Sequence, residues 1–540
     1  MEMGAQKRFI AILFGSSLIT RLSLFFYYTC HGRNAWVYVD SDQYHLIAVH
    51  FLKTGSLCLQ PEGLMSYRLP GYPLYLAFWY WLGGIHQWLP LLVQIVCASF
   101  IPPLLFLLSR RLFPAFSKSA QIAGWLACFH VGFVLYAGML ATETFFVLFF
   151  LLFLFFFLPC VLFNFLKTTV RMDSTSLTTN GNSVRPERSV AKSNGYERVK
   201  HFAFAGFFLG LASMFRPLGH YVLVLAWLLL FFSSFSWMQK IKAFGALSAS
   251  WFVVVLPWLA RNTILFGVPF FHSLPGLHFL QYPAARVTSC VENISYPAAR
   301  QKVLAQWQRE IEEKENDILF AHPECRPHPS IHFASQNTSD FAKGYAGTQQ
   351  DERSVYRRTL TTNGLATAHP ELRRRMKRAL LNEYERCRLG EKQAFSLLLS
   401  HPFYVGKDAA IELCKTVFGL YSAIILLGDD MPWPDYGAHT PWQNKVKRFL
   451  LPVVKRPLLV PVIYADMIML LLLLVGFFLF IVGVFRKKYG WDVLAKILPF
   501  IALFIVVTSA YGGARLRMPA DLLFIMGAAY GLLWCCKCAK

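Results

Sequence analysis

The chain has 540 residues, of which 55% are hydrophobic and 15% are charged, and its mean hydropathy is +0.42. Soluble proteins carry roughly 25% charged residues, so this composition excludes a soluble globular protein. The formal net charge of +23 would suggest a nucleic-acid partner for a soluble chain, but here much of it lies beside apolar segments. Membrane topology and anionic head groups account for Lys and Arg there, so we expect membrane lipids and no nucleic acid as partners.

Ten apolar segments follow one another along the chain, most of them near the roughly 20 residues that cross a bilayer as a helix. In hydrocarbon every backbone N–H and C=O group must be satisfied internally, and the period-two alternation of a strand barrel is absent. We therefore predict an all-α polytopic membrane protein with about ten transmembrane helices. The predicted spans are 9–28, 88–108, 120–139, 140–166, 201–215, 217–237, 243–259, 457–485, 493–510 and 518–534.

The basic residues between these spans predict their orientation. Short connections rich in Lys and Arg stay on the cytoplasmic side of a membrane. With the N-terminus inside, every predicted inner connection is basic, which supports the parity of the span count. These connections hold Arg110 and Arg111; seven Lys and Arg within 167–200; Lys240 and Lys242; Arg486, Lys487 and Lys488; and Lys537 and Lys540.

This topology divides the chain into three parts. Residues 1–262 form an N-terminal transmembrane part, with a first outer loop at 30–87 and a cytoplasmic loop at 167–200 whose Ser, Thr and Asn content predicts flexibility. Residues 263–456 are polar enough to form a large extracytoplasmic domain, because long domains cross the membrane largely regardless of their charge. Residues 457–540 form the C-terminal transmembrane helices.

Seven charged residues from distant parts of the sequence are predicted at the outer face. A charge near membrane depth costs about 2.5–3.5 kcal/mol on insertion scales, so it normally faces a cavity and marks function. Arginine binds phosphate with a bidentate fork, and a carboxylate can act as a general base or hold a divalent metal against phosphate. The seven residues are Asp40, Asp42, Glu143, Arg216, Arg261, Arg515 and Arg517.

A plainer interpretation exists for each arginine. Arginine at the end of a span often extends its side chain to the interface without any further role. Glu143 is not explained in this way, because Glu reaches the interface poorly and the hairpin around it is otherwise very apolar. Together, the carboxylates and arginines on one face suit an anionic substrate and proton-transfer chemistry.

The same residues lie in motifs that occur in a known order. The first outer loop contains Asp40-Ser-Asp-Gln-Tyr44 and then Tyr67-Arg-Leu-Pro-Gly-Tyr-Pro-Leu74. Four further motifs follow, namely Ala141-Thr-Glu143, Gly210-Leu-Ala-Ser-Met-Phe-Arg216-Pro, Pro257-Trp-Leu-Ala-Arg261-Asn and Ala514-Arg515-Leu-Arg517-Met-Pro519. This series resembles the protein mannosyltransferase and aminoarabinose transferase superfamily (glycosyltransferase family 39-like), whose members have the GT-C fold. The resemblance covers most of the membrane part.

The resemblance implies a membrane glycosyltransferase that moves a sugar from a polyprenyl-phosphate donor to a lipid, glycan or protein acceptor. Asp40 would take the acceptor's proton in an inverting displacement, Glu143 would lie near the acceptor, and Asp42 is grouped with them as a third carboxylate. Because phosphate is a good leaving group, no cofactor is expected to be obligatory, while a divalent metal stays an open alternative. The substrate-binding candidates are Tyr44, Arg68, Tyr72, Arg216, Arg261, Arg515 and Arg517.

Location and substrates are less defined. The Arg-x-Pro-Gly-Tyr-Pro-Leu style of the first loop is bacterial, which implies an inner membrane with the site on its periplasmic side. The aminoarabinose transferases have a Lys-Pro-Pro element where this chain has Arg68-Leu-Pro-Gly-Tyr-Pro, so the sugar and the acceptor stay open. A transporter or flippase for a lipid-linked sugar is one alternative, although it would place charges mid-membrane in repeated halves. A polysaccharide polymerase or ligase is another.

One spacing in the predicted outer domain could bind zinc. Three prolines interrupt it, so an irregular loop without metal is the favoured interpretation and no metal ligand is assigned. The residues concerned are His322, Cys325, His328 and His332.

Overall fold

The computed structural model describes residues 3–30, 40–58, 67–114, 116–173, 188–321, 381–422, 460–487, 491–508 and 514–538. Within these ranges the regular structure is helical and no strand occurs. The all-α architecture predicted from the sequence is therefore confirmed for the described part of the chain. The possible zinc ligands at 322–332 lie outside it.

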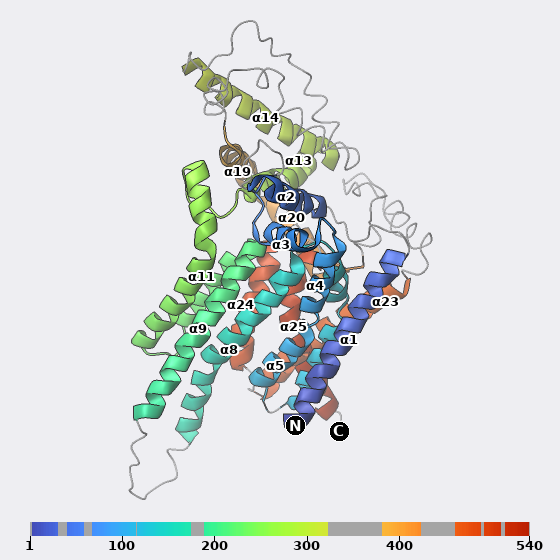
Figure 1. The fold of residues 1–540 in the computed structure, drawn as a ribbon, viewed down its shortest axis with the longest axis vertical. Helices are drawn as coiled ribbons and strands as arrows, with labels where there is room; N and C mark the ends of the chain where they lie inside the picture. Colours follow the sequence, from blue (N-terminus) through green and yellow to red (C-terminus); the bar gives the residue numbers. More distant parts are fainter. Residues whose placement is uncertain are drawn as a thin grey trace, which may run out of the picture.

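Long apolar helices form a bundle with both chain termini at one end (Figure 1). Each of the ten predicted apolar ranges overlaps helices of this bundle. They are α1 (Met3–Cys30), α4 (Trp88–Ala98), α5 (Ile101–Leu112), α6 (Ser117–Phe129), α7 (Val131–Leu135), α8 (Glu143–Asp173), α9 (Arg188–Phe215), α10 (Leu218–Phe231), α11 (Trp237–Phe266), α23 (Val460–Lys487), α24 (Trp491–Thr508) and α25 (Ala514–Cys538).

By length and composition, six helices of the described chain can cross a membrane, or seven if a bent pair counts as one span. The pair is Ser117–Phe129 and Val131–Gly138, whose axes differ by 51°. The predicted spans at 217–237 and 493–510 correspond to shorter apolar helices, Leu218–Phe231 and Val493–Val507. The polytopic prediction is confirmed, while the predicted number of about ten exceeds what this criterion counts.

The connection between α8 and α9 is shorter than the cytoplasmic loop predicted at 167–200. Helix α8 runs on to Asp173 and α9 begins at Arg188, so both helices extend beyond the apolar residues that marked them. Residues 174–187 lie outside the described chain, and the predicted flexibility of this loop falls largely on them.

A second group of helices gathers at the end of the bundle opposite the termini (Figure 1). Two come from the first predicted outer loop and the others from the predicted outer domain. They are α2 (Ser41–Thr54), α3 (Gly71–Gly83), α12 (Leu274–Phe279), the π-helical turn η2 (Leu280–Ala284), α13 (Ala285–Glu292), α14 (Tyr296–Ala321), α19 (Glu383–Ser400) and α20 (Pro402–Phe418). Helix α20 packs against α24 and α25 and so joins this group to the bundle.

Phenylalanine fills the centre of the bundle. Phe146, Phe150, Phe153 and Phe157 are fully buried and recur at the spacing of one helix face on α8. The Phe150 ring lies edge-on to Phe504 of α24, with 4.9 Å between the ring centres. Such aromatic pairs add roughly 0.5–1.5 kcal/mol beyond the area they bury, so this face joins α8 firmly to α24.

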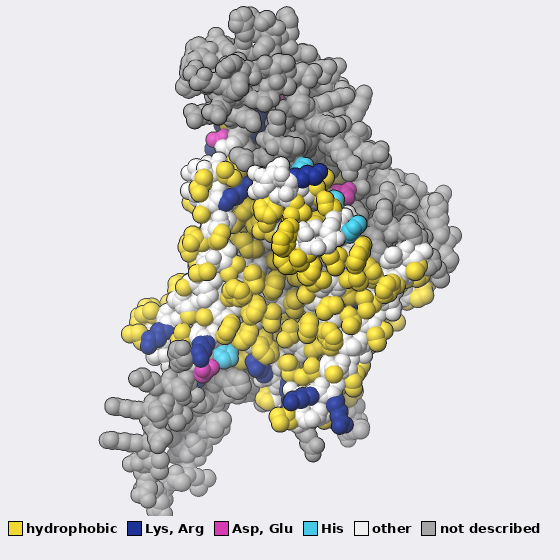
Figure 2. Space-filling model, in the orientation of Figure 1, with side chains coloured by type: hydrophobic (Ala, Val, Ile, Leu, Met, Phe, Trp, Pro, Cys, Tyr) yellow, Lys and Arg dark blue, Asp and Glu magenta, His cyan; other side chains and the backbone are white. Residues whose placement is uncertain are grey.

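The outer surface of the bundle is apolar. Figure 2 shows a continuous hydrophobic surface over the bundle, with Lys and Arg gathered mainly towards its two ends. An apolar patch of this extent is not exposed to water in a stable soluble protein, and basic side chains at its edges match the two membrane interfaces. The protein is accordingly an integral, multi-pass membrane protein.

Close packing of α9 on α11 gives a test of the fold. A Cβ atom added to Gly206 of α9 would lie 2.1 Å from the carbonyl oxygen of Leu247 on α11, so Gly206→Ala must push the helices apart. We expect a loss of about 1–3 kcal/mol, typical of overpacking, measured by thermal unfolding in detergent. Gly245→Ala on α11 is the control, because a Cβ there meets nothing within 4 Å. Equal unfolding temperatures for the two variants would contradict this packing.

Candidate functional site

Five charged side chains from five separate segments meet at the end of the bundle opposite the termini. We call them the charged cluster. Two are carboxylates and three are guanidinium groups, and only one of the five is wholly shielded from solvent. The members are Asp40, Arg68, Glu143, Arg216 and Arg515.

Asp40 lies at the N-cap position of α2, but its carboxylate does not cap the helix. Arg68 donates to Oδ1 at 2.6 Å and Arg515 donates to Oδ2 at 2.9 Å, so both oxygens are occupied by arginines. Burial raises the pKa of Asp40, but the charges and hydrogen bonds of Arg68 and Arg515 outweigh it and hold the pKa below its ordinary value. Asp40 is therefore ionised at neutral pH.

Glu143 is the first residue of α8 and is fully buried. Its position suits a carboxylate, because the first turn of a helix carries partial positive charge. Arg515 donates through Nε to Oε1, and Nη1 of Arg216 lies 3.3 Å from the same oxygen. Thr142 also donates to Oε2 at 3.4 Å. Arg515 thus bridges the carboxylates of Asp40 and Glu143.

Contacts from α2 orient the remaining arginine of the cluster. Arg68 donates through Nε to Gln43 at 2.9 Å, and its guanidinium lies 5.3 Å from the centre of the Tyr44 ring. Ser41 donates to the carbonyl of Leu140 at 2.8 Å and so holds the start of α2 beside the start of α8. With three arginines and two carboxylates, the cluster carries one net positive charge and can accept an anion such as phosphate.

Tyr72 and Tyr44 lie behind the cluster, with 5.2 Å between their ring centres. The Tyr72 hydroxyl donates to Gln94 at 2.9 Å, and both residues are buried. Gln94 in turn donates to the carbonyl oxygens of Tyr136, Ala137 and Met139, at 3.2, 3.0 and 2.7 Å. The hydroxyl of Tyr72 therefore already supports the turn that precedes Glu143, while its proposed contact with a sugar stays a prediction.

Three other predicted site residues lie apart from the cluster. Asp42 lies in the first turn of α2 and shares no ion pair with the cluster among the described residues. Arg261 lies over the Trp258 ring, 4.8 Å from its centre, and donates to Asn262 at 2.8 Å. Arg517 is paired with Asp521 at 2.9 Å. Their roles as catalytic or substrate-binding groups stay predictions.

The Arg517 pair belongs to a second buried group that the sequence analysis did not identify. His130, Tyr421 and Asp521 contact one another there, at a depth where carboxylates are costly. A signal for it was present, because Asp521 is a carboxylate inside a predicted span and lies one helical turn after Arg517. The partners His130 and Tyr421 are far away in sequence and carry no comparable signal.

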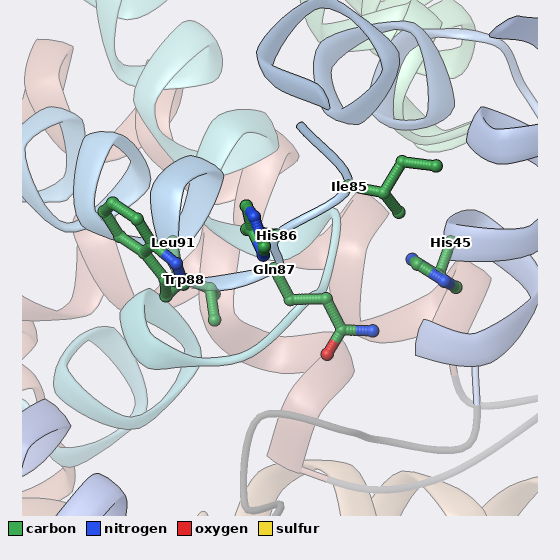
Figure 3. A pocket seen from close by; sticks show the side chains of 6 residues that line it. All are labelled: His45, Ile85, His86, Gln87, Trp88 and Leu91. Carbon is green, nitrogen blue, oxygen red and sulfur yellow. The ribbon is translucent and has the colours of Figure 1, made fainter. Parts of the chain in front are cut away.

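A separate pocket of about 440 Å³ opens beside α2. Figure 3 shows the six side chains that line it, with His45 opposite the Ile85–Trp88 turn. His45 is hydrogen-bonded through Nδ1 to the Tyr80 hydroxyl at 2.9 Å. None of the lining residues belongs to the charged cluster, so this pocket is not the place where the cluster's charges act.

The described chain contains no group of three or more His, Cys, Asp or Glu side chains arranged to hold a metal ion. The carboxylates of the cluster face arginines instead, which satisfy the oxygens that a divalent cation would need. A requirement for metal is untested by this geometry.

No family model matches the sequence, and no curated protein matches it. Among solved structures, the chain is similar to the crystal structure of ArnT from Cupriavidus metallidurans in the apo state, at 13% sequence identity and a TM-score of 0.31. The match covers 94% of this chain and 76% of that chain. A similarity this distant carries no conclusion about activity.

Removing the carboxylate of Glu143 tests the electrostatics of the cluster. In Glu143→Gln, Arg216 and Arg515 lose the anion that they share, so two largely buried guanidinium groups face each other with Asp40 as the remaining carboxylate. We expect a loss of about 3–5 kcal/mol in the free energy of unfolding, the usual cost of breaking a buried pair from one side.

The control is Glu292→Gln, because Glu292 forms an exposed pair with Lys302 at 2.6 Å. That pair is worth about 0–1 kcal/mol, and unfolding in detergent compares the two variants directly. Similar stability losses in both would show that the cluster is no more strongly coupled than a surface ion pair.

Proposed function

We propose that this protein is a membrane glycosyltransferase that moves a sugar from a polyprenyl-phosphate donor to a lipid, glycan or protein acceptor at the outer face. The observation that carries the proposal is the charged cluster: three arginines surround two carboxylates where the bundle meets the outer helices. Guanidinium groups neutralise a departing phosphate, and a carboxylate accepts the proton of an attacking hydroxyl or amine. The order of the motifs, which resembles the GT-C superfamily, supports the same reaction class.

The reaction needs one bond to form while another breaks. The acceptor's O–H or N–H group attacks the anomeric carbon of the sugar, and its proton goes to Asp40. The bond between that carbon and the phosphate oxygen breaks, and its electron pair stays on the phosphate. Arg216 and Arg515 neutralise the charge that develops there, so a single displacement inverts the anomeric centre.

The shared contacts of Arg515 give this reaction an order. Arg515 is held by Asp40 and Glu143 together. The phosphodiester of the donor carries one negative charge, as a carboxylate does, and offers Arg515 a bidentate acceptor, so donor binding competes with Asp40 for Arg515 and draws it away. Asp40 then keeps only Arg68 and becomes a stronger base. The base is thus activated only when the donor is in place.

The surroundings of the cluster fit the rest of the proposal. The apolar surface of α9, where Phe204 and Phe207 are exposed, can hold a polyprenyl chain in the bilayer, while the helices at the outer end leave the acceptor in water. We place the protein in a bacterial inner membrane, with this end in the periplasm. The sugar follows from turnover, because the donor that is consumed identifies it.

Asp40→Asn tests the catalytic assignment. Removing the base is expected to lower the release of polyprenyl phosphate from a labelled polyprenyl-phosphate sugar by about 10²–10⁴-fold, the usual contribution of general base catalysis. The assay uses the full chain in lipid nanodiscs, with Glu292→Gln as the matched carboxylate-to-amide control. If Asp40→Asn releases polyprenyl phosphate at the wild-type rate, Asp40 is not the catalytic base. If the wild type releases nothing from any donor and labelled lipid crosses the bilayer, the protein is a transporter.

The pH dependence of turnover tests how Arg68 acts on Asp40. The base form of Asp40 is present above its pKa, so activity falls only as pH drops through that value, which lies below the ordinary range. In Arg68→Met one of the two lowering charges is lost, while burial still raises the pKa. The acid limb of kcat/KM is therefore expected to move up by about 1–3 pH units.

Arg388→Met is the control, because Arg388 forms an exposed pair with Glu391 on α19. Its acid limb should match that of the wild type. An unshifted limb in Arg68→Met would mean that a group other than Asp40 governs the acid side of the profile.

A further inference from the structure

We propose that the second buried group, formed by His130, Tyr421, Arg517 and Asp521, is a positioning device for Arg515. It holds the first turn of α25 in place and so sets how Arg515 reaches Asp40 and Glu143. We call it the anchor cluster. This inference rests on the proposed function for its kinetic test, but its structural test is independent of any activity.

The geometry of α25 separates the two arginines. Arg515 and Arg517 are two residues apart near the start of the helix, so their side chains point roughly 200° apart around its axis. Arg515 faces the charged cluster and bridges two carboxylates. Arg517 faces away from it, towards Asp521 and the end of α20. The first turn of α25 thus carries Arg515, which faces the charged cluster, and Arg517, which faces the anchor cluster.

Arg517 is tied down by several acceptors at once. Its Nε donates to Asp521 at 2.9 Å, and Nη1 donates to the carbonyl oxygens of Thr416 and Gly419 at 3.0 and 3.2 Å. Those carbonyls end α20, where the chain has no further helical N–H groups to satisfy them. The arginine therefore caps α20 and joins it to α25, with its side chain only 3% exposed.

The carboxylate of Asp521 also contacts Tyr421 and His130, the other members of the anchor cluster. The Tyr421 hydroxyl donates to its Oδ2 at 2.6 Å, and Nε2 of His130 lies 3.2 Å from the same oxygen. Nδ1 of His130 accepts from the backbone N–H of Phe133 at 3.3 Å, which leaves the ring proton on Nε2 for Asp521. Three elements, the α6–α7 bend, the segment after α20 and α25 itself, meet on one carboxylate.

Steric contacts leave little freedom for this arrangement. A Cβ atom on Gly132 would lie 2.7 Å from the Tyr421 ring, so the tyrosine fits closely against α7. A Cβ atom on Gly419 would lie 3.0 Å from the backbone nitrogen of Ala514, the first residue of α25. The end of α20 therefore touches the helix one residue before Arg515. A shift of the anchor cluster must move Arg515.

The kinetic test is a double-mutant cycle between Tyr421 and Arg515. Tyr421→Phe removes one hydrogen bond of the anchor cluster and keeps the ring, so we expect it to destabilise the fold less than Asp521→Asn. We expect kcat for polyprenyl phosphate release to fall on the order of 10- to 100-fold with KM nearly unchanged, as for a misplaced catalytic group. In an Arg515→Lys background, the same change should cost almost nothing further, because coupled residues are not additive.

The control is Ser248→Ala, which removes the acceptor of the 3.1 Å hydrogen bond that Trp227 of α10 donates to Ser248 of α11. It should leave kcat unchanged in both backgrounds. Equal, multiplicative losses from Tyr421→Phe with and without Arg515 would overturn the proposal. So would full activity of Tyr421→Phe at a lowered unfolding temperature, since the group would then serve stability alone.

A cryo-electron microscopy comparison of the wild type and Tyr421→Phe in nanodiscs separates this inference from the proposed function. The expected result is a shifted first turn of α25, with Arg515 no longer bridging Asp40 and Glu143. An unchanged bridge overturns the inference whatever the enzyme does. If the wild type turns over no donor, the proposed function fails, and this comparison alone decides whether the anchor cluster positions Arg515.

Discussion

The sharing of one guanidinium between Asp40 and Glu143 is the interaction on which the end of the bundle opposite the termini depends. Arg515 comes from the last helix, Asp40 from the first outer loop and Glu143 from the start of α8. Burying these charges singly would cost several kcal/mol each, and only their convergence makes the burial acceptable. The positions of α2, α8 and α25 relative to one another are therefore set by the same contacts that create the candidate site.

The surrounding structure supports this convergence with neutral hydrogen bonds. Gln94 satisfies three carbonyl oxygens of the turn before Glu143, at a depth where water is scarce. Tyr72 donates a hydrogen bond to the side-chain oxygen of Gln94 and so fixes the orientation of that amide. Around these residues, rows of phenylalanine on α8 hold α24 close. The apolar packing makes this end of the bundle rigid, and the few polar groups fix the orientation of the turn before Glu143.

The sequence alone predicted much of this arrangement because the bilayer imposes simple rules. Long apolar runs sufficed for the helices, and charges predicted at one face sufficed for Asp40, Glu143, Arg216 and Arg515 as a group. The span count was harder, because α10 is apolar but short and α6 bends at His130. The separation of Arg517 from Arg515 follows from side-chain direction around one helix, and its signal in the sequence, the Asp521 carboxylate one turn after Arg517, was not used. Arg261 shows the same limit, since its partner Trp258 is local and gives no sign of a site.

The order in which these groups appear along the chain has a consequence for biogenesis. Gln94 precedes the carbonyls that it satisfies, so the turn before Glu143 finds its donor already present when it enters the membrane. Arg515 is the opposite case, because it lies 475 residues after Asp40 and 372 after Glu143. The two carboxylates therefore lack their shared counter-charge until α25 has been made. Closure of the site thus follows the insertion of α25, and a chain that lacks this helix leaves Asp40 and Glu143 without the arginine that joins them.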